Sequence, residues 1–284
     1  MIKFNKITII GVGLIGASFA YALKAKKSVE KIIGYGRNET NLLYAKNEGL
    51  IDDYCLDIIE ACNQSDLIFL STPIGTFKDI IDTIKSSLKQ HTIITDAGSV
   101  KGQLVHDIES SLSEDIFFVG SHPIAGSHKS GAKNYDKNLF YNSLCIITPT
   151  KKTHKESFNK IYELWKGIGC RIEILDPFEH DHIYNLVSHM PHLLSFCLVN
   201  TVFESNKKAF DFAGKGFKDM SRLAGSSPEI WRDIIIYNKD NVLKSLDTLQ
   251  GHLQMVKAII SRDDISSLED YFRKATEIYN KNAL

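Results

Sequence analysis

The sequence predicts an α/β protein, with a doubly wound, mostly parallel sheet followed by an all-helical C-terminal domain. Two observations support this prediction. Between residues 6 and 174, short apolar stretches alternate with helical stretches of roughly 10–15 residues, which is typical of a parallel sheet with crossover helices. After Asp176-Pro177 the strand pattern stops, and helical periodicity continues to the C-terminus. We therefore place a boundary near residue 175, between domains at 1–175 and 176–284.

Composition narrows the class of protein. The 284 residues are 43% hydrophobic and 24% charged, which is ordinary for a globular chain. Lys+Arg and Asp+Glu are both 34, so no broad basic field exists to hold nucleic acid. No run approaches the roughly 18 apolar residues of a membrane span, and the N-terminus lacks a signal-peptide cleavage site. The five cysteines form no CxxC pair, which favours a reducing cytoplasm. We expect a cytoplasmic protein that binds neither nucleic acid nor membrane.

The first expected strand, Lys6–Ile10, runs into the sequence GVGLIG and then into a helix that ends near Ala25. A GxGxxG pattern is informative in this context, between a strand and a helix. Its first glycine allows a tight turn, the second lets a pyrophosphate approach the backbone, and the third lets helix and strand pack closely. The alternative is a glycine-rich turn that binds nothing. We interpret 1–175 as a Rossmann-type dinucleotide-binding domain, with cofactor contacts at Gly11, Gly13, Leu14, Ile15 and Gly16.

The second expected strand, Lys31–Tyr35, bears on the choice of cofactor. An acidic residue just after this strand would bind the adenosine ribose and repel a 2′-phosphate. The chain instead has Gly36-Arg37-Asn38, and Arg37 is able to pair with a 2′-phosphate. Glu39 keeps NAD open as the alternative. The cofactor is therefore expected to be NAD or NADP, with NADP accepted.

Polar side chains follow the next two strands. Ligands of doubly wound sheets lie beyond the carboxyl ends of the strands. Thr72 and Pro73 follow one strand, so we expect them to border the cofactor. Ser99 follows the other and lies either beside the site or at the N-cap of the helix that begins near Lys101. The expected elements here are strands at Asp66–Leu70 and Thr92–Thr95, and helices near Thr40–Glu48, Asp57–Cys62 and Thr76–Leu88.

The stretch Phe118–Gly131, FVGSHPIAGSHKSG, carries the densest set of reactive side chains. It begins as an apolar strand, and we expect the strand to break off at Gly120. A buried core has no use for so many polar groups, because each would need a partner. The stiff, apolar Pro123-Ile124-Ala125 is unlike a solvated linker. We interpret the stretch as an active-site loop, although His122 alone is also compatible with a capping or core histidine.

The helical half begins with a long helix, about Phe178–Glu204, which contains SHMPH at 188–192. Pro191 should kink it, because proline offers no N–H and its ring displaces a helix carbonyl. His189 and His192 lie three residues apart and share a face. No third ligand is evident, so we expect no metal there and two histidines placed to bind a polar ligand. The remaining strands are expected at Leu144–Thr148 and Arg171–Ile174, with a helix at His154–Gly167 between them.

Arg222 lies among small and apolar neighbours, so it needs an anionic partner. That partner is either a protein carboxylate, such as that of Asp219, or a ligand carboxylate. The sequence SSPE places Pro228 in the first turn of a helix. Two amphipathic helices, about Lys239–Arg262 and Ile265–Asn280, are packing or dimer material.

Taken together, these residues resemble the prephenate dehydrogenase family of tyrosine biosynthesis over nearly the whole chain. The resemblance implies a nucleotide domain, a helical domain that forms a homodimer, and an active site between them. It rests on five motifs in order: GVGLIG at 11–16, TDAGSVKG at 95–102, GSHPIAGSHKSG at 120–131, SHMPH at 188–192 and GFKDMSRLAGSSPEIW at 216–231.

The resemblance implies oxidative decarboxylation of prephenate to 4-hydroxyphenylpyruvate, with hydride passing from C4 of the ring to the nicotinamide. By resemblance, His122 is the hydrogen-bond acceptor for the C4 hydroxyl, Ser99 orients it and touches the nicotinamide side, and Arg222 binds a carboxylate bidentately. Asp219 is expected to orient Arg222. The residues expected to line the substrate pocket are Ser188, His189 and His192.

One position departs from the family pattern. Many members have a glutamate six residues after the catalytic histidine, at a position thought to gate access, where this chain has His128. A histidine there is able to be cationic near neutral pH and to attract an anionic substrate. We expect no appended regulatory domain, so tyrosine, if it inhibits, is expected to compete at the active site.

Three rival interpretations stay open. Arogenate, which has an amino group in place of the keto group, would undergo the same chemistry. A β-hydroxyacid dehydrogenase also joins a Rossmann domain to helices, but it uses a catalytic lysine and has no place for the HPIAG sequence. A catalytically silent nucleotide-binding module would keep the glycine loop without needing His122, His192 and Arg222 together.

Overall fold

The computed structural model describes residues 2–126 and 129–282. By compactness the chain divides into two units, Met1–Asn238 and Lys239–Leu284. The first unit holds the whole sheet and the helices up to α10, and the second holds two helices. This division separates compact bodies, whereas the boundary near residue 175 separates strands from helices and stays a prediction.

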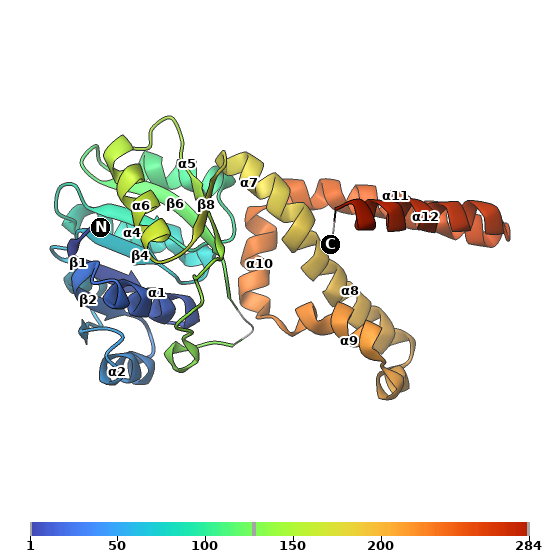
Figure 1. The fold of residues 1–284 in the computed structure, drawn as a ribbon, viewed down its shortest axis with the longest axis horizontal. Coiled ribbons are helices and arrows are strands. Elements are labelled where there is room, and N and C mark those ends of the chain that lie inside the picture. Colours follow the sequence, from blue (N-terminus) through green and yellow to red (C-terminus); the bar gives the residue numbers. More distant parts are fainter. Residues whose placement is uncertain (1, 127–128, 283–284) are drawn as a thin grey trace. The chain divides into compact units, whose positions relative to one another are not determined.

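The first unit is built on one eight-stranded sheet with the order β3-β2-β1-β4-β5-β6-β7-β8 (Figure 1). Strands β1 to β6 pair in parallel and β7 pairs antiparallel to β6, so the predicted doubly wound, mostly parallel sheet is confirmed. The strands are β1 (Phe4–Ile10), β2 (Val29–Tyr35), β3 (Asp53–Tyr54), β4 (Leu67–Leu70), β5 (Ile93–Asp96), β6 (Phe117–Ile124), β7 (Leu144–Thr148) and β8 (Arg171–Ile174).

Helices cover both faces of this sheet (Figure 1). Where a helix was predicted, its residue range agrees to within a few residues, apart from the long helix after Asp176, and the helix at Lys215–Ser221 was not predicted. Strand β3 was missed, because two residues are too short to show a periodic pattern. The helices of the first unit are α1 (Leu14–Ala25), α2 (Glu39–Asn47), α3 (Ile58–Cys62), α4 (Phe77–Ile84), α5 (Gly102–Ser111), α6 (Lys155–Gly167), α7 (Pro177–Tyr184), α8 (Met190–Ser205), α9 (Lys215–Ser221) and α10 (Pro228–Tyr237).

Strand β4 shows how the sheet separates two hydrophobic cores. Leu67 and Phe69 pack in the core that contains residues of α1 and α6, whereas Ile68 and Leu70 pack in the core that contains residues of α4 and α5. Successive side chains of a strand point to opposite faces, so a continuous apolar run marks a strand buried on both sides. In the first core, the rings of Phe19 and Phe69 stack with centroids 4.0 Å apart.

The expectation that a strand breaks off at Gly120 was wrong. Strand β6 continues to Ile124, pairing in parallel with β5 up to Val119 and antiparallel with β7 from Gly120 onward. At this change of partner a Cβ on Gly120 would lie 2.5 Å from Oγ1 of Thr148, so the missing side chain permits the close pairing. His122 therefore stands on a strand of the sheet and not on a loop, which holds it more rigidly.

The long helix predicted at 178–204 is interrupted. Helix α7 is followed by a π-helical turn, Asn185–His189, and α8 begins at Met190 with Pro191 in its first turn. π-Helical turns inside α-helices are frequently found at functional sites. Proline has no N–H to donate, and the hydrogen-bond pattern of the helix changes just before Pro191, while the predicted kink stays a prediction.

One stretch in the described part of the chain is long and apolar enough to cross a membrane by length and composition alone. Within Pro177–Ser205, an 18-residue window has a mean hydropathy of 1.3, and 11% of it is buried. The expectation that no stretch approaches a membrane span was therefore too strong, because it counted uninterrupted apolar runs. Core helices of soluble proteins also meet this criterion, so it is weak support for a span.

The second unit consists of α11 (Lys239–Ser261) and α12 (Ile265–Lys281). The side chain of Asp264 caps α12 by accepting the backbone N–H of Ser267 at 3.0 Å. Tyr271 of α12 and His252 of α11 lie within 3.2 Å of each other, which joins the two helices.

Candidate active site

The glycine loop between β1 and α1 has a different spatial demand at each glycine. Gly11 has φ +96°, and a Cβ there would lie 2.8 Å from the backbone of Ser71. A Cβ on Gly16 would overlap the carbonyl oxygen of Gly11, so close packing of helix on strand requires glycine. Gly13 is the N-cap of α1 and has nothing within 4 Å of its Cβ position. Open space over free N–H groups at a helix start suits a pyrophosphate.

Two side chains, those of Thr72 and Asn41, lie beside the glycine loop. A methyl carbon of Thr72 would meet a Cβ on Gly11 at 2.8 Å, so the residue that follows β4 does lie beside the loop. Asn41 of α2 donates to the carbonyl of Val12 at 2.6 Å and accepts from the N–H of Ala132 at 2.7 Å. Asn41 thus ties the glycine loop to the segment after β6, a role that no sequence pattern indicated.

The end of β2 presents an exposed arginine. Asn38 caps α2, accepting from Asn41 at 3.0 Å, and Glu39 accepts a hydrogen bond from the hydroxyl of Tyr54 at 2.9 Å. Arg37 is exposed and forms no ion pair in the described part of the chain. The acidic alternative, Glu39, is therefore engaged with another side chain while Arg37 is available to a ligand.

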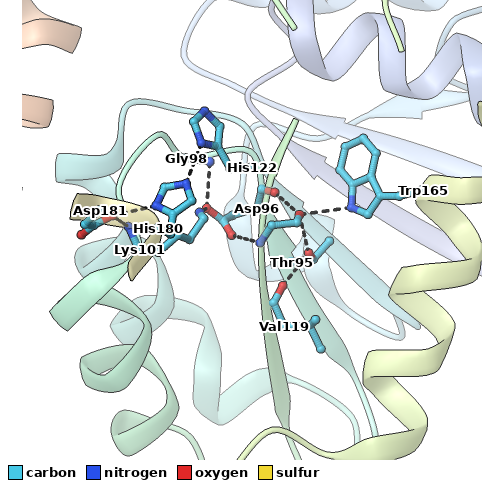
Figure 2. A network of polar contacts seen from close by, with 10 residues as sticks. Thr95, Asp96, Gly98, Lys101, Val119, His122, Trp165, His180 and Asp181 are labelled. Atoms are coloured by element: carbon cyan, nitrogen blue, oxygen red, sulfur yellow. Dashed lines mark hydrogen bonds and ion pairs between the residues drawn. The ribbon is translucent and has the colours of Figure 1, made fainter. Parts of the chain in front are cut away.

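His122 lies at one end of a chain of buried polar groups. Its Nδ1 is 2.8 Å from Nε2 of His180, and Nδ1 of His180 is 2.8 Å from Oδ1 of Asp181. Figure 2 shows the second ring nitrogen of His122 directed away from His180. Burial lowers the pKa of His122 well below its ordinary 6.5, and the nearby His180 and Lys101 lower it further. His122 is therefore a neutral imidazole near pH 7 and is able to accept a hydrogen bond.

A buried ion pair between Lys101 and Asp96 lies beside this chain of hydrogen bonds (Figure 2). The Lys101 ammonium donates to Oδ2 of Asp96, and both side chains are 1% exposed. The same Asp96 carboxylate accepts the backbone N–H of Gly98 at 2.8 Å and of Ser121 at 3.0 Å. The indole of Trp165 donates to the hydroxyl of Ser121 at 3.1 Å. Asp96 thus fixes the end of β5 to the residue that precedes His122.

Ser99 does not cap α5, so that alternative was wrong. The N-cap of α5 is Lys101, and its N–H is held by Asp181 at 2.7 Å. The Ser99 hydroxyl makes no hydrogen bond to the residues that the structure describes, and its backbone lies against His189. Whether Ser99 orients His122 stays a prediction, because Nδ1 of His122 is already bonded to His180.

His189 is fully buried in the π-helical turn. Its Nδ1 lies 3.0 Å from the amide nitrogen of Asn238, which donates to it, so the ring proton sits on Nε2. That Nε2 has no well-formed hydrogen bond to any described residue. Burial lowers the pKa of His189 to about 4, so the ring is neutral.

His192 and Arg222 come together on the helical side. The His192 ring stacks on Trp231 at 3.6 Å, and its Nδ1 donates to the carbonyl of Ser188 at 2.9 Å. Burial lowers the pKa of His192, and the positive charge of Arg222 lowers it further. Arg222 is exposed and forms no ion pair with Asp219 within the described residues. Its binding of a ligand carboxylate therefore stays a prediction.

Two further predictions concern metal and gating. The described residues contain no cluster of three or more His, Cys, Asp or Glu side chains able to hold a metal ion. His128 lies outside the described residues, so its gating role stays a prediction.

Sequence reasoning missed His180 and Asp181 altogether. They follow the predicted domain boundary, in the sequence EHDH. Acidic residues are common in the first turn of a helix, so this sequence did not indicate a site. His180 and His122 are 58 residues apart, so no local pattern joins them. The one available signal for a site here was a histidine with acidic neighbours near the start of a helix, and this signal is weak.

Known proteins match both the sheet-forming part of the chain and the helices that follow it. Residues 19–174 match the model for the nucleotide-binding domain of prephenate dehydrogenase, and residues 176–274 match the model for its dimerization domain. The prephenate dehydrogenase of Bacillus subtilis is 33% identical over 277 residues, covering 96% of this chain and 75% of that protein.

Two solved structures are similar throughout. Prephenate dehydrogenase from Aquifex aeolicus, in complex with hydroxyphenyl propionate and NAD+, superposes with a TM-score of 0.91 at 35% identity, covering 98% of both chains. Arogenate dehydrogenase from Synechocystis gives a TM-score of 0.81 at 29% identity, covering 98% of this chain and 99% of that one. Because two family models together match residues 19–174 and 176–274, and a curated prephenate dehydrogenase is 33% identical over 96% of the chain, the chain belongs to the prephenate dehydrogenase family of oxidoreductases.

Proposed function

We propose that the chain catalyses the oxidative decarboxylation of prephenate to 4-hydroxyphenylpyruvate, with a nicotinamide dinucleotide as hydride acceptor. The observation that carries the proposal is a neutral, buried His122 at the end of the sheet where the glycine loop and Thr72 also lie. Residues 1–175 would bind the dinucleotide, and 176–284 would supply substrate contacts and the dimer interface.

The dinucleotide fits the glycine loop. Gly13 leaves its Cβ position open, and the N–H groups of Leu14 and Ile15 begin α1, so the pyrophosphate would rest there. Thr72 and Pro73 would border the nicotinamide half, because they follow β4 beside Gly11. When bound, the nicotinamide supplies the acceptor for a hydride.

His122 would accept the hydrogen bond of the C4 hydroxyl. As hydride leaves C4, the hydroxyl becomes strongly acidic, and an acceptor stabilises the positive charge that develops there. The bond between C1 and the ring carboxylate breaks, its electron pair enters the ring, and carbon dioxide leaves. The hydroxyl proton is shared with His122 during the reaction and stays in the product phenol, so the aromatic ring forms without net proton loss.

The anionic groups of the substrate would meet the helical side of the site. Arg222 presents an exposed guanidinium beside His192, and a bidentate pair with a carboxylate suits it. His189 would line the same side of the pocket, where its ring lies against the backbone of Ser99. Ser188 and Asp219 would contribute at the rim, Ser99 would face the nicotinamide side, and His128 would influence entry.

The cofactor preference is proposed to include NADP. Arg37 is exposed at the end of β2 while Glu39 is held by Tyr54, so a 2′-phosphate would meet a cation there. Arg37→Ala should raise the Michaelis constant for NADP and leave that for NAD unchanged. A strong preference of the wild type for NAD would contradict the proposal.

Arogenate is the second candidate substrate, and the similarity to the Synechocystis arogenate dehydrogenase favours keeping it. The ring chemistry is the same, so His122 would act identically. The two substrates differ in one side-chain group, keto or amino, far from C4. The discrimination would then lie in the helical side of the pocket.

We also propose a homodimer. The match to a dimerization domain supports it. Helix α8 is rich in apolar residues, and Ser195 is its one buried residue among those described. A second copy would cover this surface, and light scattering of the purified protein would measure the mass directly.

The test of the proposed function is the initial rate of nicotinamide reduction, with prephenate and arogenate each paired with NAD and NADP. Turnover on prephenate is expected. His122→Asn should lower kcat by about 10²–10⁴-fold while substrate binding survives. If the wild type turns over neither substrate but still binds cofactor, the chain is a silent nucleotide-binding module. Near-normal turnover by His122→Asn would refute the role of His122.

A further inference from the structure

We propose that His180 and Asp181 are positioning residues that keep the proton of His122 on Nδ1 and so leave Nε2 free as the acceptor. The inference rests on the proposed function, in which His122 accepts a hydrogen bond from the substrate. The three side chains are contributed by β6 and α7, which are separated by more than 50 residues of sequence. Figure 2 shows His180 between His122 and Asp181.

The direction of each hydrogen bond follows from the Asp181 end. A carboxylate only accepts, and its Oδ1 accepts the backbone N–H of Lys101 at 2.7 Å. The same oxygen lies 2.8 Å from Nδ1 of His180, so that nitrogen must carry a proton. Burial lowers the pKa of His180, which makes the ring neutral, and a neutral ring has one N–H. Nε2 of His180 is then a lone pair.

A lone pair on Nε2 of His180 needs a donor, and the atom in front of it is Nδ1 of His122 at 2.8 Å. Nδ1 of His122 therefore carries the proton, and since this ring is also neutral, its Nε2 is unprotonated. The other tautomer of His122 would set two lone pairs against each other in a buried site. An unmade hydrogen bond of a buried group is costly, which selects the reactive tautomer.

The pair is held firmly enough to impose this choice. His180 is 0% exposed, and its ring stacks on Tyr184 with centroids 4.6 Å apart. The backbone carbonyl of Asp181 accepts from the Asn238 amide at 2.8 Å. Its other carboxylate oxygen packs against Gly102, where a Cβ would overlap it. The side chain of Asp181 is thus fixed against the start of α5, and its backbone is fixed by Asn238.

Three variants test the inference. His180→Leu removes the acceptor, so kcat should fall about 100-fold while the Michaelis constant for the substrate stays the same. His180→Gln places an amide oxygen near the original Nε2 position, so kcat should stay within about tenfold of wild type. The matched control is His106→Gln. His106 stacks on Phe178 of α7 from α5, outside the chain of hydrogen bonds, and its kcat should not change.

The tautomers themselves are measurable without turnover. In protein labelled with ¹⁵N at histidine, the two-bond couplings should show the proton on Nδ1 of both His122 and His180, with His122→Asn and His180→Gln used for assignment. In His180→Leu, the His122 signal should shift towards the Nε2–H form. A wild-type His122 with its proton on Nε2 would overturn the inference, as would a His180→Leu variant that keeps wild-type kcat.

Failure of the inference and failure of the proposed function give different results. If the wild type turns over neither prephenate nor arogenate, the proposed function fails, and the spectra alone still decide the tautomer. If the wild type is active and His122→Asn is not, while His180→Leu equals wild type, the function stands and the positioning role is refuted. A His180→Leu variant that does not fold leaves the decision to His180→Gln and to the wild-type spectra.

Discussion

His189 should make the first unit of the protein sensitive to acid. Burial lowers the pKa of this histidine to about 4, whereas an unfolded histidine has an ordinary value of 6.5. Between these two values the unfolded chain binds a proton that the folded chain refuses. Stability is therefore full above pH 6.5 and is lost as the pH falls towards 4, below which this contribution levels off.

The size of the effect follows from the difference between the folded and unfolded pKa values. A pKa difference of one corresponds to about 1.4 kcal/mol, so the full difference is about 3 kcal/mol in the free energy of unfolding. Between pH 7.5 and pH 5, the part that develops is about 2 kcal/mol. His122 and His180 also have lowered pKa values and add to the acid sensitivity of the wild type. Only a comparison with a variant isolates the share of His189.

The assay is urea unfolding at pH 7.5 and pH 5, followed by tryptophan fluorescence. The chain has two tryptophans, Trp165 and Trp231, and both lie in the first unit with His189. His189→Gln does not titrate, so its loss of stability between the two pH values should be about 2 kcal/mol smaller than that of the wild type. The exposed His91→Gln is the control and should keep the wild-type difference. Equal pH dependence in wild type and His189→Gln would refute the reasoning.

Three other outcomes are expected. The acidic limb of kcat/KM should lie below pH 6.5, because burial and nearby charge lower the pKa of His122 and keep it neutral; a limb at or above 6.5 in the pH–rate profile would contradict this. Lys101→Met should reduce the free energy of unfolding by about 3–5 kcal/mol by leaving Asp96 buried without its cation, and adding Asp96→Asn should recover part of the loss in the same denaturation assay. Gly120→Ala should cost about 1–3 kcal/mol through its contact with Thr148, and Thr148→Ala should compensate in a double-mutant cycle; additive losses would refute the contact.

Much of the fold was accessible from sequence because local physics decides it. The apolar run of β4 marks a strand buried on both faces, and β7 was placed to the residue. The glycine loop was readable for a similar reason, since Gly11 and Gly16 each answer a local steric demand. The course of β6 beyond Gly120 was not readable, because Ser121 and His122 look like loop residues until Asp96 and His180 supply their partners.

The residues of the candidate site also divide into those that local sequence indicates and those that only tertiary contacts reveal. His122 and Arg222 stood out because a reactive or charged side chain sat in a stretch of small and apolar residues. His180 and Asp181 did not, because their meaning depends on tertiary contacts with β6 and α5. Ser99 as a helix cap was wrong, because a carboxylate from the helical half accepts the N–H of Lys101 at the start of α5.

The stretch 95–102 shows how scaffold and site share one segment. The Asp96 carboxylate accepts hydrogen bonds from Gly98 and Lys101. Gly102 has no side chain, which leaves space for the carboxylate of Asp181. Each of these residues has a packing partner that explains its identity. Ser99 is different, because it lies in the middle of the same tightly held turn while its hydroxyl has no partner in the described part of the chain. A rigid turn that leaves one hydroxyl unused is suited to meet a ligand, which is the reason to keep Ser99 among the proposed site residues.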